Sequence, residues 1–416
     1  MKPMAQNDLV AGLDIGSAKV ALCTAKMQEG LIHLVTLSKA PNAGLRKGLV
    51  VDMEETVSAI SMALEETERK AGQPLASVFV GIGGAHISST NSRGVIAVSR
   101  ADGEITPSDV ERVVEAARAV AMPPNREILH VIPRHFIVDS QNGITDPVGM
   151  TGIRLEVEAH VVGGSTSAIK NLVKCIEQAG LQIDGMIFAP LAAAKMLLSK
   201  KQKEIGVILV DIGAGTTSLA VFEEGDIIHC NVLPIGSLHI TNDIAIGLKT
   251  SLEVAEKVKL QFGHALPDEV RATEIIDLAK IKSEERGRVT RKELSEIIQA
   301  RLDEIFTLIK NDLRQISKEG MLPAGVVFTG GGSKLEGLCE AAKEGLKLPA
   351  QIGTPVFEAS GMVDKFDDPV YSTAVGLTLW GLEEGEKPQY RLPQLKIKDF
   401  GGILGKTKDF FKQFLP

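Results

Sequence analysis

Hydrophobic and polar residues follow two patterns along this chain, short apolar runs and longer amphipathic segments. Runs such as Ser77–Ile82 and Gln182–Phe188 have the length and composition of buried strands. Residues 53–71 and Thr166–Ala179 repeat apolar positions at helical spacing, and the first of these segments lies between Asp52 and Gly72, a helix start and stop signal. Strands that alternate with helices predict an α/β fold.

The segment from Ala85 to Val162 has a different pattern, with strand-like stretches around a single helix. The stretches are Val95–Val98, Leu129–Val138 and Leu155–Val162. The helix is predicted to begin after Thr106, with Pro107 at its first position, Asp109 in its first turn and an apolar stripe behind them. We interpret this segment as a small α+β module inserted into the first domain.

Two segments share one motif, in which an apolar run leads into Asp-Ile-Gly, a turn of small residues and a second apolar run. The first is Gly12–Lys19 and the second is Leu209–Thr217. Each copy predicts a β-hairpin whose turn offers backbone N–H groups to phosphate oxygens. The candidate phosphate ligands are Gly16, Ser17, Ala18 and Lys19 in the first copy, and Gly213, Ala214, Gly215, Thr216 and Thr217 in the second. The acids Asp14 and Asp211, if they face each other, can hold a hydrated Mg²⁺, so the two copies predict like domains that clamp one nucleotide.

A third turn of this kind follows the predicted strand Gly325–Phe328. Its residues Gly330, Gly331, Gly332 and Ser333 precede a helix predicted from Leu335. Glycines between a strand and a helix favour a ribose and phosphate site, although such a turn also occurs without any ligand. Together with the two hairpins, this turn favours nucleotide binding.

Composition restricts the class of protein. A chain of 416 residues, 44% hydrophobic and 24% charged, is expected to form two to four globular domains. The net charge of −7 argues against a nucleic-acid partner. The four cysteines and eight histidines lack metal-site spacing, which favours reduced thiols in a cytoplasmic protein. Neither a signal peptide in Met1–Asp8 nor an apolar stretch of membrane-spanning length is present in the sequence.

The end of the chain predicts a membrane contact. Residues 383–398 are polar, contain Pro388 and Pro393, and are interpreted as a tether. On a helix the following residues would separate into an apolar face (Phe400, Ile403, Leu404, Thr407, Phe411, Phe414 and Leu415, with Phe410 at its edge) and a basic face (Lys406, Lys408 and Lys412). Such an amphipathic helix suits an anionic membrane interface, forming only on contact because Gly401, Gly402 and Gly405 weaken its first turn. The alternative is docking on the protein's own body or on a partner.

The three turns, with predicted linker helices near Pro190 and at Tyr371–Gly381, resemble the actin-like ATPase superfamily. Within it the chain is similar to the FtsA family of bacterial division proteins, through Val78–Ile87, Glu127–Pro133, Asp146–Met150 and Arg154–Val157. The resemblance implies an actin-like two-lobe ATPase fold with duplicated mixed-sheet domains, in which an inserted domain replaces one actin subdomain. It also implies a protein that binds ATP and Mg²⁺, polymerises, and recruits FtsZ and later division proteins at the cytoplasmic face of the plasma membrane.

On this resemblance the chain divides into eight segments. They are the first lobe (1–84 and 163–205), the inserted domain (85–162), the second lobe (206–237 and 323–382), a lid subdomain (238–322), the tether (383–398) and the membrane helix (399–416). Asp14 and Asp211 become the catalytic and magnesium-binding acids. Glu256 and Lys259 become adenosine ligands, although a surface pair three residues apart looks the same. Ala189 stands where chaperone relatives carry an acid near the attacking water, which predicts slow ATP hydrolysis.

The family uses its lid subdomain to hold the C-terminal peptide of FtsZ. Here the resemblance indicates the helical run Val289–Leu313, with Arg291, Lys292 and Arg301 as candidate contacts. An ordinary solvated helix face is the alternative for each of them. Two other classes of the same fold remain open. A small-molecule kinase needs a catalytic base between the lobes, for which no loop is evident. A PilM-like pilus scaffold lacks the amphipathic tail.

Overall fold

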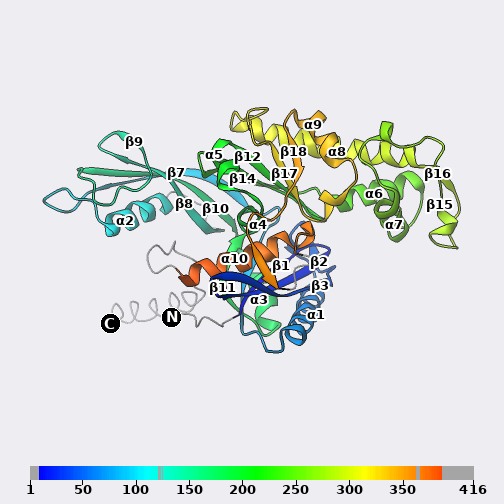
Figure 1. Ribbon diagram of the computed structural model, residues 1–416, viewed down its shortest axis with the longest axis horizontal. Helices are drawn as coiled ribbons and strands as arrows, with labels where there is room; N and C mark the ends of the chain where they lie inside the picture. The colour runs from blue at the N-terminus through cyan, green and yellow to red at the C-terminus, as the bar shows by residue number, and fades with distance from the viewer. Residues whose placement is uncertain (1–8, 120–122, 124, 362–365, 387–416) are drawn as a thin grey trace, which may run out of the picture.

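The protein consists of two stacked lobes, with one module at each end of its long axis (Figure 1). The computed structural model describes residues 9–119, 123, 125–361 and 366–386. Helices α4 (Ala189–Leu197) and α10 (Ser372–Glu386) lie between the lobes, close to the predicted linker positions. Residues 383–386, assigned above to the tether, continue α10. The rest of the tether and the predicted membrane helix lie outside the described residues.

The first lobe is a six-stranded sheet of order β11-β6-β1-β2-β3-β19, with helices α1 (Met53–Ala71) and α3 (Thr166–Gln178). The strands are β1 (Val10–Ile15), β2 (Lys19–Gln28), β3 (Leu31–Pro41), β6 (Ser77–Ile82), β11 (Gln182–Phe188) and β19 (Ala359–Gly361). The predicted helix 53–71 is confirmed: the Asp52 carboxylate accepts from the Glu55 N–H, and Gly72 ends the helix with φ of 71°. A short hairpin of β4 (Leu45–Arg46) and β5 (Leu49–Val50) precedes it.

The second lobe repeats this plan in a five-stranded sheet of order β14-β13-β12-β17-β18. The strands are β12 (Val207–Ile212), β13 (Thr217–Glu223), β14 (Asp226–Leu233), β17 (Val326–Thr329) and β18 (Ala350–Ile352). Strand β12 pairs antiparallel with β13 and parallel with β17, as β1 does with β2 and β6. The duplicated mixed-sheet architecture is therefore confirmed. The lobe also contains α5 (Lys200–Ile205) and α9 (Leu338–Leu346).

The inserted module is a four-stranded antiparallel sheet of order β7-β10-β8-β9 with one covering helix, α2 (Pro107–Arg118). Its strands are β7 (Ser88–Ala97), β8 (Arg126–Val138), β9 (Gln141–Ile144) and β10 (Arg154–Ser165). The predicted cap is present, since the Thr106 hydroxyl accepts from the Asp109 N–H and the Asp109 carboxylate accepts from Thr106. Val113 and Leu155 belong to a separate hydrophobic core beneath α2, so the module is a small domain.

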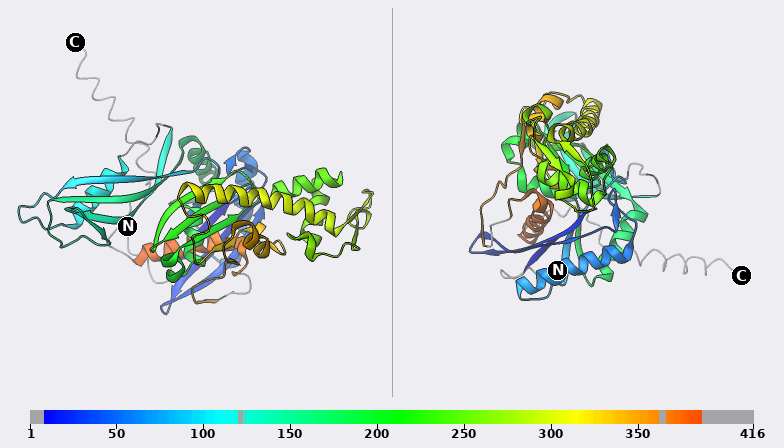
Figure 2. Two further views of the ribbon diagram at one scale, coloured as in Figure 1. Left: turned by 90° about the horizontal axis from the view of Figure 1, so that it is seen from above. Right: turned by 90° about the vertical axis from the view of Figure 1, so that its right-hand side faces the viewer.

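The subdomain at the opposite end is mainly helical, as predicted, and also contains a short hairpin (Figures 1 and 2). Its helices are α6 (Ser237–Leu248), α7 (Leu252–Phe262) and α8 (Arg291–Gln315), and the hairpin strands are β15 (Ile275–Asp277) and β16 (Arg288–Thr290). Helix α8 extends along the second lobe, where Phe306 and Ile309 join one continuous core with the sheet residues Val210 and Phe328. That shared core fixes the subdomain to the lobe.

Candidate functional site

The two predicted hairpin turns have one backbone geometry. The Gly16 N–H donates to the Lys19 carbonyl (2.8 Å), and the Gly213 N–H donates to the Thr216 carbonyl (2.9 Å). In each turn two residues lie between the hydrogen-bonded pair, Ser17 and Ala18 in the first and Ala214 and Gly215 in the second. The N–H groups of Gly16 and Gly213 therefore have partners within the turns. Phosphate binding by the turn residues stays a prediction.

The two turns meet across the space between the lobes. A Cβ atom added at Gly215 would lie 2.9 Å from the Ser17 Oγ and 3.2 Å from the Lys47 N. Ser17 in turn accepts a hydrogen bond from the Gly48 N–H (3.4 Å). A glycine at 215 is what permits this approach. The structure thus brings together the two copies of the motif.

The acids of the two hairpins share one electrostatic environment. Lys19 forms an ion pair with the Asp14 carboxylate (3.3 Å) and donates to the Val370 carbonyl (2.6 Å). Burial raises the pKa of Asp211 to about 6, and the negative charge of Asp14 adds to this, whereas Lys19 opposes it. An acid with such a pKa is stabilised in its charged form by a cation. The pair therefore suits a magnesium ion held through water.

The third turn borders Asp211 directly. Thr329, the last residue of β17, pairs with Asp211 of β12, and Gly330 follows with φ of 82°. A Cβ at Gly330 would lie 2.1 Å from the Asp211 Oδ1. The Ser333 hydroxyl donates to the Gly330 carbonyl (2.7 Å) and closes a 3₁₀ turn over Gly331–Lys334. The helix predicted from Leu335 begins later, at Leu338, because Glu336 forms an isolated β-bridge with His264 and Gly337 has a left-handed backbone with φ of 77°.

The candidate adenosine residues belong to a polar cluster of the lid. The Lys259 ammonium contacts the Glu256 carboxylate (2.7 Å) and the Thr241 hydroxyl (2.8 Å), and it is only 9% exposed. Its third contact is the carbonyl of Ser237 (3.3 Å), whose N–H donates to the Gly213 carbonyl in the second turn. Hydrogen bonds through Ser237 therefore connect the cluster to the second hairpin turn. A buried lysine with three partners differs from the solvated pair that the sequence alone allows.

The segment after residue 366 completes the site, and the sequence reasoning missed it. The Val370 carbonyl accepts a hydrogen bond from the Lys19 ammonium. The Lys334 ammonium pairs with Asp368 (3.0 Å), and the Thr329 and Ser372 hydroxyls lie 2.8 Å apart. In the sequence, the dipeptide Asp368-Pro369 predicts only a turn and gives no sign of a binding site. The proximity of this segment to the first hairpin depends on the contact of Val370 with Lys19, which lies 351 positions earlier in the sequence.

The three basic residues predicted for peptide binding all have acidic partners in the lid. The Arg301 guanidinium is bidentate on Asp243 (2.6 and 2.8 Å) and also pairs with Glu304. The other two pair elsewhere: Arg291 with Glu274 and Glu336, and Lys292 with Asp268 (3.4 Å). The structure brings Arg291 and Lys292 to the start of α8 and places Arg301 further along, against α6.

Two negative findings apply to the described part of the chain. There, no group of three or more His, Cys, Asp or Glu side chains is arranged to hold a metal ion. A magnesium ion would thus need nucleotide oxygens beside Asp14 and Asp211. Within the same residues, no helix is long and apolar enough to span a bilayer.

Comparison with solved structures defines the class of protein. The fold is similar to that of PilM in the "PilM-PilN type IV pilus biogenesis complex" (TM-score 0.66, 18% identity, 90% of this chain and 98% of that chain). It is also similar to MreB5 of Spiroplasma citri bound to ADP (TM-score 0.57, 13% identity, 92% of this chain and 98% of that one). Two duplicated lobes around paired hairpin turns define an actin-like protein.

Sequence comparison defines the family. Residues 208–376 match the model "Cell division protein FtsA", and residues 84–163 match "SHS2 domain inserted in FTSA". The chain is 40% identical to Cell division protein FtsA of Pseudomonas aeruginosa (92% of each chain) and 38% identical to that of Bacillus subtilis (95% of this chain, 89% of that one). The chain belongs to the FtsA family of cell division proteins.

Proposed function

We propose that this chain is an ATP-binding, polymerising anchor of the division ring, which tethers FtsZ filaments to the cytoplasmic membrane. The observation that carries the nucleotide part is the contact of the two acid-bearing turns at Ser17 and Gly215, bordered by the third turn at Gly330. MreB5, which shares the fold, was solved with ADP and with AMPPNP. ATP fits this site because Lys19 and the turn residues offer donors to its phosphates.

In this proposal each part of Mg²⁺–ATP is bound by its own set of residues. Ser17, Ala18, Lys19 and the turn Ala214–Thr217 hold the phosphates. Asp14 and Asp211 hold the ion through water, and Glu256, Lys259 and Gly330–Ser333 border the nucleoside. The bound ion neutralises phosphate charge. Position 189, the first of α4, carries an alanine, so this site lacks an acid there to orient an attacking water. ATP then acts chiefly as a ligand that joins the lobes, and its hydrolysis is slow.

The membrane part of the proposal rests on the sequence after residue 386. Seven large apolar side chains on one helical face (Phe400, Ile403, Leu404, Phe411, Phe414 and Leu415, with Phe410 at its edge) and three lysines on the other suit the interface of an anionic bilayer. Burial of seven such side chains contributes on the order of 10 kcal/mol before the entropy of ordering opposes it. With this anchor, the proposed location of the protein is the cytoplasmic face of the plasma membrane.

The FtsZ part of the proposal uses the lid. The C-terminal peptide of FtsZ, partly acidic and partly apolar, is proposed to bind along α8. Lys292 is one candidate cation there, because its side chain is 39% exposed and its contact with the exposed Asp268 carboxylate is long (3.4 Å). The inserted domain would contact a neighbouring copy in the polymer and later division proteins.

Co-sedimentation with anionic vesicles tests the whole proposal. The full chain with Mg²⁺–ATP should pellet with vesicles and bring FtsZ with it. A chain without residues 400–416 should leave both in the supernatant. Lack of ATP binding by calorimetry in the presence of Mg²⁺ would contradict the nucleotide part, and pelleting of the shortened chain would contradict the tail as anchor.

A further inference from the structure

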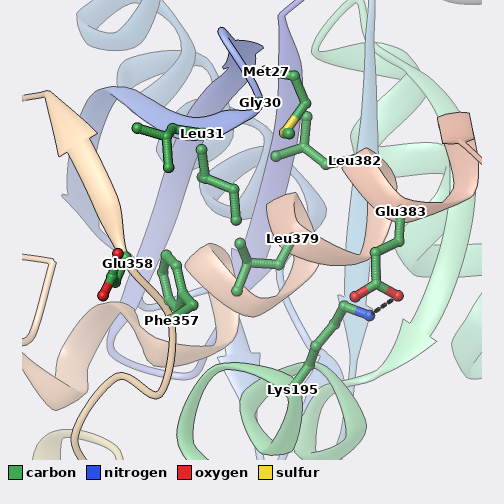
Figure 3. Close-up of a pocket in the computed structure, with 10 residues that line it drawn as sticks. Met27, Gly30, Leu31, Lys195, Phe357, Glu358, Leu379, Leu382 and Glu383 are labelled. Carbon is green, nitrogen blue, oxygen red and sulfur yellow. Dashed lines mark ion pairs between the residues drawn. The ribbon is translucent and has the colours of Figure 1, made fainter.

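A small apolar pocket lies beside the last turns of α10 (Figure 3). Its volume is about 240 Å³, and its lining comes from the β2–β3 hairpin, the segment before β19, α4 and α10. The apolar lining residues are Met27, Leu31, Ile32, Phe357, Leu379 and Leu382. One aromatic ring is of a size to enter a pocket of this volume.

The rim of the pocket carries charge on two sides. Lys195 of α4 and Glu383 of α10 form an ion pair at one side, and the Lys195 ammonium also lies 5.4 Å from the Trp380 ring centroid. At the other side Glu358 is exposed and has no ion pair with any described residue. Leu31 is 52% exposed beside it. A suitable occupant is therefore apolar with an adjacent cation.

The chain itself carries such an occupant close by. Helix α10 contributes Leu379, Leu382 and Glu383 to the pocket, and the described part of the chain ends with Glu386, one turn later. Thirteen residues separate Glu386 from Phe400, and at about 3.3 Å per residue they reach about 45 Å. Residues 387–399 are therefore long enough for the segment 400–416 to reach the pocket. It carries four phenylalanines and the cations Lys406, Lys408 and Lys412.

We propose that this pocket is the lipid-free docking site of the chain's own segment 400–416, with one phenylalanine ring inside and a lysine against Glu358. The proposal rests on the membrane anchor proposed above and adds a second, competing position for it. A phenylalanine in the pocket is withheld from lipid. The apparent membrane dissociation constant therefore equals the intrinsic constant divided by the undocked fraction.

Vesicle binding by the full chain tests the competition. Leu31→Glu places a charge at the pocket mouth, and Met62→Glu on α1 is the matched control, because the two side chains are 52% and 51% exposed. On anionic vesicles an added carboxylate alone weakens binding slightly. We expect Leu31→Glu instead to bind at least threefold more tightly than the natural chain, and Met62→Glu to bind no more tightly. Equal behaviour of the two variants would overturn the proposal.

Amide hydrogen exchange without lipid tests docking itself. Replacement of Phe400, Phe410, Phe411 and Phe414 by serine in the full chain should speed exchange in residues 28–32 and 356–361. Exchange in α1, outside the pocket, should stay the same. Unchanged exchange at the pocket would overturn docking even if vesicles still bind. If exchange responds but no form of the chain pellets with vesicles, docking stands and the membrane anchor fails. Protection that increases with protein concentration would assign the pocket to a second copy and overturn the proposal.

Discussion

Gly376 of α10 packs directly against the backbone of Ala192 in α4. A Cβ atom at position 376 would lie 1.9 Å from the Ala192 carbonyl oxygen and 2.4 Å from its carbon. Helices can approach this closely only where one of them lacks a side chain. Both helices lie between the lobes (Figure 1), so this contact sets the distance at which the two hairpin turns face each other.

Gly376→Ala is therefore expected to push the two helices apart. Overpacking of this kind typically lowers the free energy of unfolding by about 1–3 kcal/mol, and ATP affinity should fall with it because the turns separate. Urea unfolding and calorimetry measure the two effects. Gly83→Ala is the control, since a Cβ there meets only the Ala189 Cβ at an ordinary 3.8 Å. A stable Gly376→Ala variant with normal ATP affinity would contradict this role of the crossing.

Adjacent glycines of the third turn should respond differently to the same substitution. Gly330→Ala strains a backbone with φ of 82° and drives its Cβ into Asp211 and the Ile212 carbonyl, whereas a Cβ at Gly331 finds its nearest atom 4.0 Å away. We expect Gly330→Ala to abolish ATP binding and Gly331→Ala to bind within about threefold of the natural chain. Calorimetry with Mg²⁺–ATP distinguishes the two, and similar losses would mean that the turn itself, not its contact with Asp211, holds the ligand.

Local patterns were sufficient to predict the parts of the site that a short stretch of sequence determines. An apolar run, Asp-Ile-Gly and a second apolar run specify a hairpin. One such hairpin spans Val10–Gln28 and the other spans Val207–Glu223. The cap at Thr106 and the end of α1 at Gly72 were predicted for the same reason. In each case the partners lie within a few residues of one another.

Contacts between distant residues could not be predicted in this way. Val370 receives the Lys19 ammonium although 351 positions separate them, and Asp243 lies 58 positions from Arg301. The polar start of β7, Ser88–Arg93, lacks the apolar run by which strands were recognised, because several of its side chains face solvent. Strand pairing with β10, not local composition, makes that segment a strand.

Asp211 should make the stability of the ligand-free protein depend on pH. Its pKa rises from 3.8 to about 6 on folding, so the folded state favours the protonated form, and this stabilisation is lost as the pH rises through about 6. The shift corresponds to about 3 kcal/mol at most, at 1.36 kcal/mol per pKa unit. Asp211→Asn should therefore be more stable than the natural chain at pH 8 and similar to it at pH 4 in urea titrations. A difference that stays constant with pH would contradict the raised pKa.

Variants of the Arg301–Asp243 ion pair distinguish two roles that Arg301 can have. If the guanidinium contacts the FtsZ peptide itself, Asp243→Asn should release it and leave peptide affinity the same or higher. If Arg301 instead holds α8 to α6, both Arg301→Lys and Asp243→Asn should weaken binding and lower stability by about 1 kcal/mol. Since the pair is bidentate and only about a quarter exposed, we expect the second result. Peptide titration and urea unfolding of both variants decide between them.

Two lysines on α7 provide the test of the adenosine assignment. Lys259 is 9% exposed and contacts Glu256, Thr241 and Ser237 near the second hairpin, whereas Lys257 pairs with Glu253 at the surface. Lys259→Met removes a cation from the predicted nucleoside side of the site and should weaken ATP binding at least tenfold. Lys257→Met removes the same charge from the same helix and should change it less than twofold. Because net charge changes equally in both variants, a long-range electrostatic effect on the triphosphate would weaken both alike, and that result would remove Lys259 from the binding site.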